Sequence, residues 1–315
     1  MDTDPLFQEI DKKYSLVKKI GGGSFSEVYL VSSPQGTTAL KLLKKVPLAA
    51  RQLEILSDFK SEFSILKNLN HPNIARILDF GFDANLERYY FTTEWVDGKD
   101  LFASTEGATI ETILERMVQA LRALEYLHAS KIFHFDLKAA NVLVRTDDAV
   151  KVIDFGLASI DPTGKMIGTP TYMAPEIINR ERPDGRADLY SLGVLFYYCL
   201  TRQNPFRGNG VQETLKRQQM FSPPPPSLAN PKIPLFLDRI VMHLLQKNPA
   251  DRYQRASEVI RDINRELPNK FAMETRETLL SYLPEEGQLI GRSRELALLK
   301  NLFTTVYKEN GGTPS

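Results

Sequence analysis

The apolar residues of this chain change their spacing near Gly98, and this change limits the folds that the chain can adopt. From residue 14 to residue 46, apolar and polar residues alternate in short runs that are broken by Gly21-Gly22-Gly23 and by Pro34-Gln35-Gly36. Such alternation predicts antiparallel hairpins. After Gly98, apolar residues recur every three or four positions, which predicts helices at 110–129, 187–201, 233–247 and 255–266. The sequence therefore predicts an α+β chain, with a small antiparallel β lobe followed by a larger, mainly helical lobe.

Further elements complete the predicted small lobe. A helical spacing over residues 52–69 is set by Leu53, Leu56, Phe59, Phe63, Leu66 and Leu69. Two strands are expected around 74–82 and 88–96. The segment Glu94-Trp95-Val96-Asp97-Gly98 is then the connection between the two lobes.

Composition excludes several classes of protein. The 315 residues are 42% apolar, enough for a full core, and the net charge of +1 gives no electrostatic reason to expect nucleic acid or a membrane surface as partner. The longest apolar run, Leu192 to Leu200, is nine residues, far below the ~20 that cross a bilayer. The acidic start lacks the features of a signal peptide, and the single cysteine, Cys199, allows no intrachain disulfide. We expect a cytoplasmic protein.

One stretch concentrates groups suited to phosphoryl transfer. His134-Phe135-Asp136-Leu137-Lys138-Ala139-Ala140-Asn141 places an acid, a lysine and an asparagine at offsets of two and five, and Asp154-Phe155-Gly156 begins eighteen residues after Asp136. Transfer from ATP needs a carboxylate that orients the hydroxyl, a cation on the transferring group, and oxygen ligands for magnesium.

This stretch resembles the catalytic loop of a protein kinase, except that Phe135 stands where that family usually has arginine. The resemblance implies that Asp136 orients the substrate hydroxyl and that Lys138 neutralises the transferring phosphoryl group. In this family, a lysine at the position of Lys138 indicates serine/threonine substrates. The resemblance also implies that Asn141 and Asp154 hold Mg2+. His134 would be a core residue, because no nucleophilic serine or cysteine motif accompanies it.

The nucleotide-binding motifs of the same family appear earlier in the chain. Gly21, Gly23 and Ser26 occupy the three small positions of a glycine-rich loop that Val28 closes, with serine in place of the third glycine. Lys41 of Thr38-Ala39-Leu40-Lys41 matches the lysine that reaches the α- and β-phosphates of ATP. Glu62 is the expected counter-charge of Lys41, and Glu54 is a rival on the same predicted helix.

The resemblance also assigns the adenine pocket. Val28, Ala39 and Leu143 would enclose the base, and the backbone of Glu94 and Val96 would meet its edge, with Thr93 bordering a deeper pocket.

A second strong match is Gly168-Thr169-Pro170-Thr171-Tyr172-Met173-Ala174-Pro175-Glu176, which resembles the end of a serine/threonine kinase activation segment. Thr169 would brace Asp136 and Lys138. Glu176 would pair with Arg252, and Asp188 would anchor the backbone of the catalytic loop. The run from Arg186 to Gly193 is familiar from bacterial-type kinases.

In the family, the arginine that Phe135 replaces usually binds an activating phosphate on the activation segment. Lys165 stands where the phosphorylated residue commonly lies. We therefore expect activity without activation-segment phosphorylation, with Thr163 as the remaining candidate site. The alternative is a pseudokinase that binds nucleotide without transferring phosphate, although every catalytic role is filled in the sequence.

The tail resembles the beginning of another module. Residues 269–287 are polar and predict a linker, and Leu289-Ile290-Gly291-Arg292-Ser293-Arg294-Glu295-Leu296 resembles the entry to a signal-transduction P-loop ATPase. We expect the N-terminal part of a longer protein; the alternative is an amphipathic helix that folds back on the kinase. The proline run 223–226 predicts a surface loop rather than a ligand for a proline-binding module.

These patterns predict a two-lobed protein kinase fold with four parts: an extension at 1–13, an N-lobe at 14–96, a C-lobe at 97–268, and a linker with the start of a downstream region at 269–315. The implied function is ATP- and Mg2+-dependent phosphorylation of serine or threonine in protein substrates within a signalling protein. Its partners would be the protein substrate and the downstream domains of the same chain. A nucleotide-binding scaffold is the non-enzymatic alternative, and the complete activation segment disfavours a small-molecule phosphotransferase.

Overall fold

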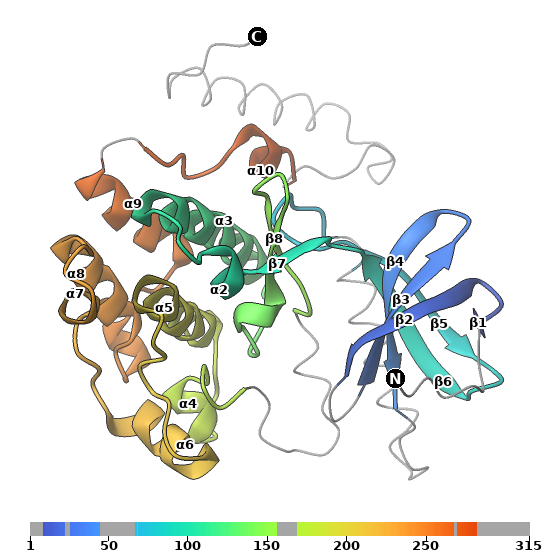
Figure 1. Ribbon diagram of the computed structural model, residues 1–315, viewed down its shortest axis with the longest axis horizontal. Coiled ribbons are helices and arrows are strands. Elements are labelled where there is room, and N and C mark those ends of the chain that lie inside the picture. Colours follow the sequence, from blue (N-terminus) through green and yellow to red (C-terminus); the bar gives the residue numbers. More distant parts are fainter. Residues whose placement is uncertain are drawn as a thin grey trace.

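The computed structural model describes residues 9–22, 26–44, 67, 69–155, 169–267 and 270–281. Figure 1 shows a lobe of β-strands beside a lobe of helices, joined by a short connection. The two-lobed α+β architecture predicted from the change of apolar spacing is confirmed.

The small lobe is an antiparallel sheet whose strands lie in the order β1-β2-β3-β4-β6-β5. Along β4, Leu40 and Leu42 are fully buried in the core of this lobe, whereas Ala39 and Lys41 face the opposite side and line a cleft. Because side chains alternate along a strand, one face of the sheet makes the core and the other makes the cleft. The strands are β1 (Glu9–Ile10), β2 (Tyr14–Gly22), β3 (Ser26–Ser33), β4 (Gly36–Leu43), β5 (Ile77–Asp83) and β6 (Arg88–Glu94).

Strand β1 belongs to this sheet, although residues 1–13 were predicted as an extension outside the lobe. Ile10 pairs with Tyr14 of β2 and is fully buried. The N–H of Asp11 donates to Asp83, and the hydroxyl of Tyr90 donates to the Asp11 carboxylate at 2.6 Å. β1 has only two residues, too few to show an alternating pattern, so no periodic signal marks this strand in the sequence.

The large lobe is built around helices α3 and α5. The N-cap Thr109 accepts a hydrogen bond from the N–H of Thr112 at the start of α3, and Asp184 caps α5 through the N–H of Arg186. The helices are α2 (Leu101–Ser104), α3 (Ile110–Ala129), α4 (Pro175–Ile178), α5 (Gly185–Thr201), α6 (Val211–Met220), α7 (Pro226–Ala229), α8 (Leu235–Leu244), α9 (Ala256–Glu266) and α10 (Arg276–Ser281), with 3₁₀ turns η1 (Ala139–Asn141) and η3 (Pro249–Asp251).

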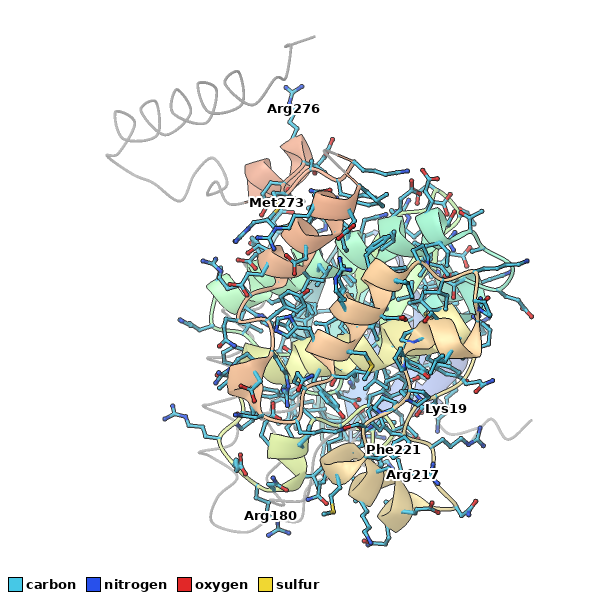
Figure 2. All side chains as sticks on the ribbon, turned by 90° about the vertical axis from the view of Figure 1, so that its left-hand side faces the viewer. Lys19, Arg180, Arg217, Phe221, Met273 and Arg276 are labelled. Carbon is cyan, nitrogen blue, oxygen red and sulfur yellow. The ribbon has the colours of Figure 1, made fainter. Side chains whose placement is uncertain are left out.

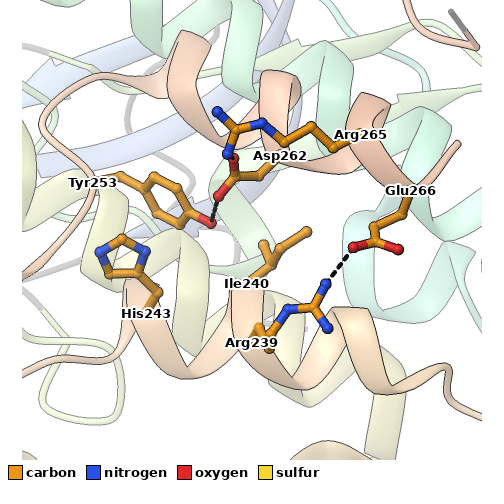
Figure 3. Close-up of a pocket in the computed structure, with 7 residues that line it drawn as sticks. All are labelled: Arg239, Ile240, His243, Tyr253, Asp262, Arg265 and Glu266. Atoms are coloured by element: carbon orange, nitrogen blue, oxygen red, sulfur yellow. Dashed lines mark hydrogen bonds and ion pairs between the residues drawn. The ribbon is translucent and has the colours of Figure 1, made fainter. Parts of the chain in front are cut away.

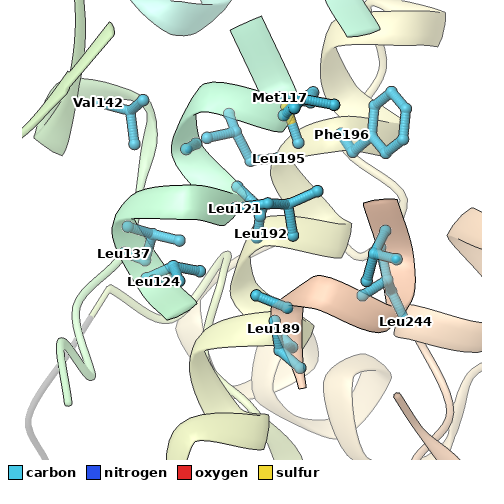
Figure 4. Close-up of a cluster of buried hydrophobic side chains, with 14 of the residues drawn as sticks. Met117, Leu121, Leu124, Leu137, Val142, Leu189, Leu192, Leu195, Phe196 and Leu244 are labelled. Atoms are coloured by element: carbon cyan, nitrogen blue, oxygen red, sulfur yellow. The ribbon is translucent and has the colours of Figure 1, made fainter. Parts of the chain in front are cut away.

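The core of this lobe forms where α3, α5 and α8 meet. Figure 4 shows Leu121 of α3 and Leu192 of α5 beside one another, with Leu244 of α8 next to them. Gly193 allows this approach, because a Cβ there would lie 2.7 Å from the Cβ of Leu244. The apolar spacing that predicted these helices is therefore the spacing of residues that face one common core.

A small sheet lies between the lobes and carries the candidate site. Its strands are β7 (Gly98–Asp100), β8 (Val142–Arg145) and β9 (Val150–Val152), in the order β7-β8-β9. β6 ends at Glu94 and β7 begins at Gly98, so residues 95–97 make the crossing between the lobes. The connection lies where the sequence predicts it.

The described tail residues pack against the large lobe, although 269–287 was predicted as a linker. Asn264 brackets Phe271, accepting from its N–H and donating to its carbonyl, and Phe271 is only 8% exposed. Arg122 of α3 donates to the carbonyl of Ala272. In Figure 2, Met273 and Arg276 lie at the opposite end of the lobe from Arg180, Arg217 and Phe221. These anchors are single residues, which leave no periodic signal in the sequence.

The other predicted elements compare closely with the structure. The predicted helices at 110–129, 187–201, 233–247 and 255–266 correspond to α3, α5, α8 and α9, with ends displaced by at most three residues. The predicted helix at 52–69 falls outside the described residues, apart from its last positions. Among the described helices, none has both the length and the apolar character needed to cross a membrane.

Candidate active site

The candidate catalytic loop is fixed to the large lobe by Asp188 of α5. The fully buried carboxylate accepts the N–H groups of His134 at 2.9 Å and Phe135 at 2.8 Å, and it contacts His128 at 2.9 Å. Burial alone would raise the pKa of Asp188, but the hydrogen bond and charge of His128, with the charge and N–H of His134, hold this pKa below its ordinary value. The predicted anchoring role of Asp188 is confirmed.

The side chain of Asp136 is held from two sides. Lys138 Nζ lies 2.5 Å from its Oδ2, and Thr169 Oγ1 donates to its Oδ1 at 2.9 Å. About a quarter of the Asp136 side chain stays exposed, as does 29% of Lys138. The Asp136 carboxylate is thus oriented by its neighbours and is still accessible to a hydroxyl group that approaches from the solvent side.

Asn141 and Asp154 offer oxygen atoms to a cation. Asn141 Nδ2 donates to the Asp136 carbonyl at 2.9 Å, which fixes the amide and leaves Oδ1 available. The N–H of Ile153, next to Asp154, donates to the Asn141 carbonyl at 3.0 Å. An amide oxygen and a carboxylate suit Mg2+, which prefers hard oxygen ligands and takes others from nucleotide phosphates. Among the described residues, no group of three or more His, Cys, Asp or Glu side chains could hold a metal alone.

Lys41 reaches toward the same end of the site. Its Nζ lies 3.3 Å from Asp154 Oδ2, and only 18% of the lysine side chain is exposed. Glu62 and its rival Glu54 lie outside the described residues, so the predicted Lys41–Glu62 pair stays a prediction. The described geometry therefore brings the Lys41 ammonium and the Asp154 carboxylate together.

A cleft between the lobes contains all the residues assigned to the adenine pocket, including Thr93. Val28, Ala39 and Leu143 line it together with Glu94, Val96, Lys41 and Asp154. Of the glycine-loop residues, Gly21 and the buried Ser26 lie on the β2–β3 hairpin, opposite Val28 and Leu43 respectively, and Gly23 is outside the described residues. Sequence reasoning missed four cleft residues, namely Ile20, Phe91, Trp95 and Ile153. Strand position could have found Phe91, because it is the partner of Lys41 on β6.

The end of the activation segment is tied to the large lobe by a buried ion pair. Arg252 donates to both Glu176 oxygens, at 2.7 and 2.8 Å, and the two side chains are 0% and 4% exposed. The predicted pairing of Glu176 with Arg252 is confirmed. Gln218 of α6 also donates to the Thr171 carbonyl at 2.8 Å, so the backbone close to Thr169 has a second support.

Phe135 has an unusual backbone and an apolar environment. Its φ is +56°, a region that bulky side chains rarely adopt, and its ring lies 5.5 Å from that of Phe133. The side chain is half-buried against the core of the large lobe. It occupies, with an aromatic ring, the position that the resemblance assigns to an arginine.

A second cavity lies between α8 and α9, away from these residues, and has a volume of about 280 Å³ (Figure 3). Its charged groups pair with one another: Arg239 with Glu266, and Arg265 with Asp262, which also accepts from Tyr253. The four charged side chains that line the cavity are therefore all paired.

The two lobes, the cleft between them and the loop around Asp136 together define the protein kinase class of fold. The family model described as "Protein kinase domain" matches residues 14–262, and the chain belongs to this family.

Known relatives and a solved structure agree with this assignment. The chain is 35% identical over 266 residues to a probable serine/threonine-protein kinase of Streptomyces coelicolor, covering 80% of this chain and 39% of the relative. It is 33% identical over 276 residues to serine/threonine-protein kinase PknB of Mycobacterium tuberculosis, covering 81% and 43%. The crystal structure of a mutant of the M. tuberculosis PknI kinase domain superimposes with a TM-score of 0.63 at 27% identity, covering 81% of this chain and 96% of that one. The chain thus spans about two fifths of the length of the curated relatives it matches.

Proposed function

We propose that this chain transfers the γ-phosphoryl group of ATP to serine or threonine hydroxyls of a protein substrate. The observation that carries the proposal is the arrangement of Lys138 and Thr169 on the two oxygens of Asp136. A carboxylate held in this way orients a hydroxyl for in-line attack, and orientation with charge stabilisation supplies most of the catalysis in phosphoryl transfer.

The reaction assigns a task to each residue. The substrate oxygen forms a bond to the γ-phosphorus while the bond from that phosphorus to the ADP oxygen breaks, and the hydroxyl proton passes to Asp136. Lys138 neutralises charge on the transferring group, and Lys41 contacts the α- and β-phosphates. Asn141 and Asp154 would hold Mg2+, which would supply positive charge at the β- and γ-phosphates.

The cleft residues would bind the base. Val28, Ala39 and Leu143 provide apolar walls, the backbone of Glu94 and Val96 offers hydrogen bonds to the adenine edge, and the loop with Gly21, Gly23 and Ser26 covers the phosphates. Glu62 is proposed as the residue that directs Lys41.

Asp136→Asn tests the activity. Labelled ATP and a generic protein substrate are mixed with the parent, with this variant, and with Asp147→Asn, whose side chain is 54% exposed in the β8–β9 turn. Transfer by the parent and by Asp147→Asn, but not by Asp136→Asn, is the expected result. If Mg-ATP raises the melting temperature of the parent without any transfer, the chain is a nucleotide-binding scaffold and the proposal is wrong.

We further propose that activity does not require a phosphate on the activation segment. The apolar contacts of Phe135 support this, because no guanidinium stands at that position to receive a phosphate. Phosphatase-treated protein should keep its transfer rate, and so should Thr163→Ala. Loss of activity in Thr163→Ala, together with recovery in Thr163→Asp, would show that a phosphate is needed.

We also propose that the kinase domain works within a longer signalling protein whose downstream domains are its partners in the same chain. The resemblance of residues 289–296 to a P-loop ATPase entry supports this.

A further inference from the structure

We propose that Lys151 and Glu94 form a strut that sets the separation between the adenine end and the phosphate end of the nucleotide cleft. Lys151 is then a positioning residue, which acts on the nucleotide through others. This inference rests on the proposed function, because it refines how the same cleft holds ATP.

The ion pair is short and shielded. Lys151 Nζ lies 2.6 Å from Glu94 Oε1, and only 10% of the lysine side chain and 23% of the glutamate side chain are exposed. Arg76 Nε lies 3.7 Å from the other carboxylate oxygen of Glu94, and the Arg76 side chain is 60% exposed. Lys151 is therefore the main partner of a largely shielded carboxylate, and such a carboxylate is costly to leave unpaired.

Glu94 lies at the adenine end of the cleft, and Lys151 lies on the strand that leads to Asp154 at the phosphate end. Glu94 ends β6 and lines the cleft where the adenine edge is proposed to bind. Lys151 lies on β9, three residues before Asp154, the proposed metal ligand. On β8 its cross-strand partner is Leu143, which also lines the cleft, and such partners point to the same face of a sheet.

A backbone segment between these two strands completes the strut. Lys151 Nζ also donates to the Ile74 carbonyl at 3.3 Å. The N–H of Ala75 donates to Val152 at 2.9 Å, and the N–H of Glu94 donates to Arg76 at 2.9 Å. Residues 74–76 are thus bonded to β9 on one side and to the end of β6 on the other. The ammonium of Lys151 joins all three segments.

The test uses Lys151→Met, which keeps the length of the side chain and removes its charge. We expect its KM for ATP, and its dissociation constant for ADP measured by calorimetry, to rise about tenfold, because the change removes one shielded ion pair. kcat at saturating ATP should stay within about twofold, because the groups around Asp136 are untouched. Lys151→Arg should restore most of the affinity.

Arg145→Met is the matched control, because Arg145 pairs with Asp147 at 2.9 Å on the same hairpin but is 47% exposed. It should match the parent in every measurement. The strut is refuted if Lys151→Met binds ADP like the parent, if it lowers the melting temperature without changing affinity, or if it changes kcat at constant KM. ADP binding needs no transfer, so failure of the proposed activity and failure of the strut give different results.

Discussion

The carboxylate of Asp188 holds Phe135 in a backbone conformation that its side chain disfavours. Asp188 Oδ1 accepts the Phe135 N–H at 2.8 Å, and Phe135 has a φ of +56°. A bulky residue in this region costs about 1–3 kcal/mol, and the surrounding structure must offset that cost. The strained residue immediately precedes Asp136, so the strain lies next to the carboxylate that we propose orients the substrate hydroxyl.

Asp188→Asn should therefore damage both folding and activity. An asparagine can present only one oxygen to the two N–H groups of His134 and Phe135, which leaves one of these donors facing an amide NH2. We expect a loss of about 2–3 kcal/mol of unfolding free energy and a fall in kcat of about 10–100-fold. Urea unfolding and steady-state kinetics well below the melting temperature measure the two effects. An unchanged kcat in the folded variant would mean that Asp188 serves stability alone.

Thr169→Ala should lower kcat with little effect on the KM for ATP. The change removes the hydroxyl that donates to Asp136 Oδ1 at 2.9 Å, so the carboxylate loses one of its two restraints. A decrease of about tenfold is expected for one lost hydrogen bond to a charged group. Thr169→Ser keeps the hydroxyl and should stay close to the parent. Equal rates for the alanine and serine variants would contradict the bracing role.

Arg252→Met should be strongly destabilising, because it leaves Glu176 charged and buried at 4% exposure. Removing one partner of a buried pair costs about 3–5 kcal/mol. Glu176→Gln should cost less, since the amide still accepts one guanidinium hydrogen bond. Unfolding free energies from urea titration measure both variants and their combination. The double variant should lose clearly less than the sum of the single losses, and a simple sum would show that the residues act independently.

Sequence patterns predicted those parts of the fold that repeat. The large lobe was predictable because α3, α5, α8 and α9 each turn an apolar stripe toward one core, and such a stripe is visible in sequence. β1 and residues 270–281 were not predictable, because the first is two residues long and the second is held by single contacts such as the Asn264–Phe271 bracket.

The candidate site was predictable to the extent that it is local in sequence. Asp136, Lys138 and Asn141 lie within six residues, so their convergence follows from one short loop. The bracing of Asp136 by Thr169 and the pairing of Glu176 with Arg252 span distant residues, and only the family resemblance supplied them. The Lys151–Glu94 pair joins β6 of the small lobe to β9 of the sheet between the lobes, and nothing in the spacing of either residue indicated it.

Glu27 should make the small lobe more stable at neutral pH than in acid. It receives a hydrogen bond from Lys19 at 2.7 Å and one from Arg88 at 2.8 Å, and these outweigh burial to lower the pKa of Glu27 from 4.5 to about 2. Between pH 4.5 and about pH 2, Glu27 is protonated in the unfolded chain and ionised in the folded chain. The free energy of unfolding therefore falls as the pH falls through this range. The advantage of the parent over Glu27→Gln should be complete above about pH 4.5 and shrink steadily toward pH 2.

Urea unfolding of the parent and of Glu27→Gln at a series of pH values from 7 downward measures this gap. Glu115→Gln, on the exposed face of α3, is the control and should keep a constant difference from the parent across the series. Because the carboxylate of Glu27 bridges β2 and the start of β6, its protonation should loosen the sheet that carries the glycine-rich loop. A gap between the parent and Glu27→Gln that does not change with pH would show that Glu27 stabilises the lobe by packing and not by its charge.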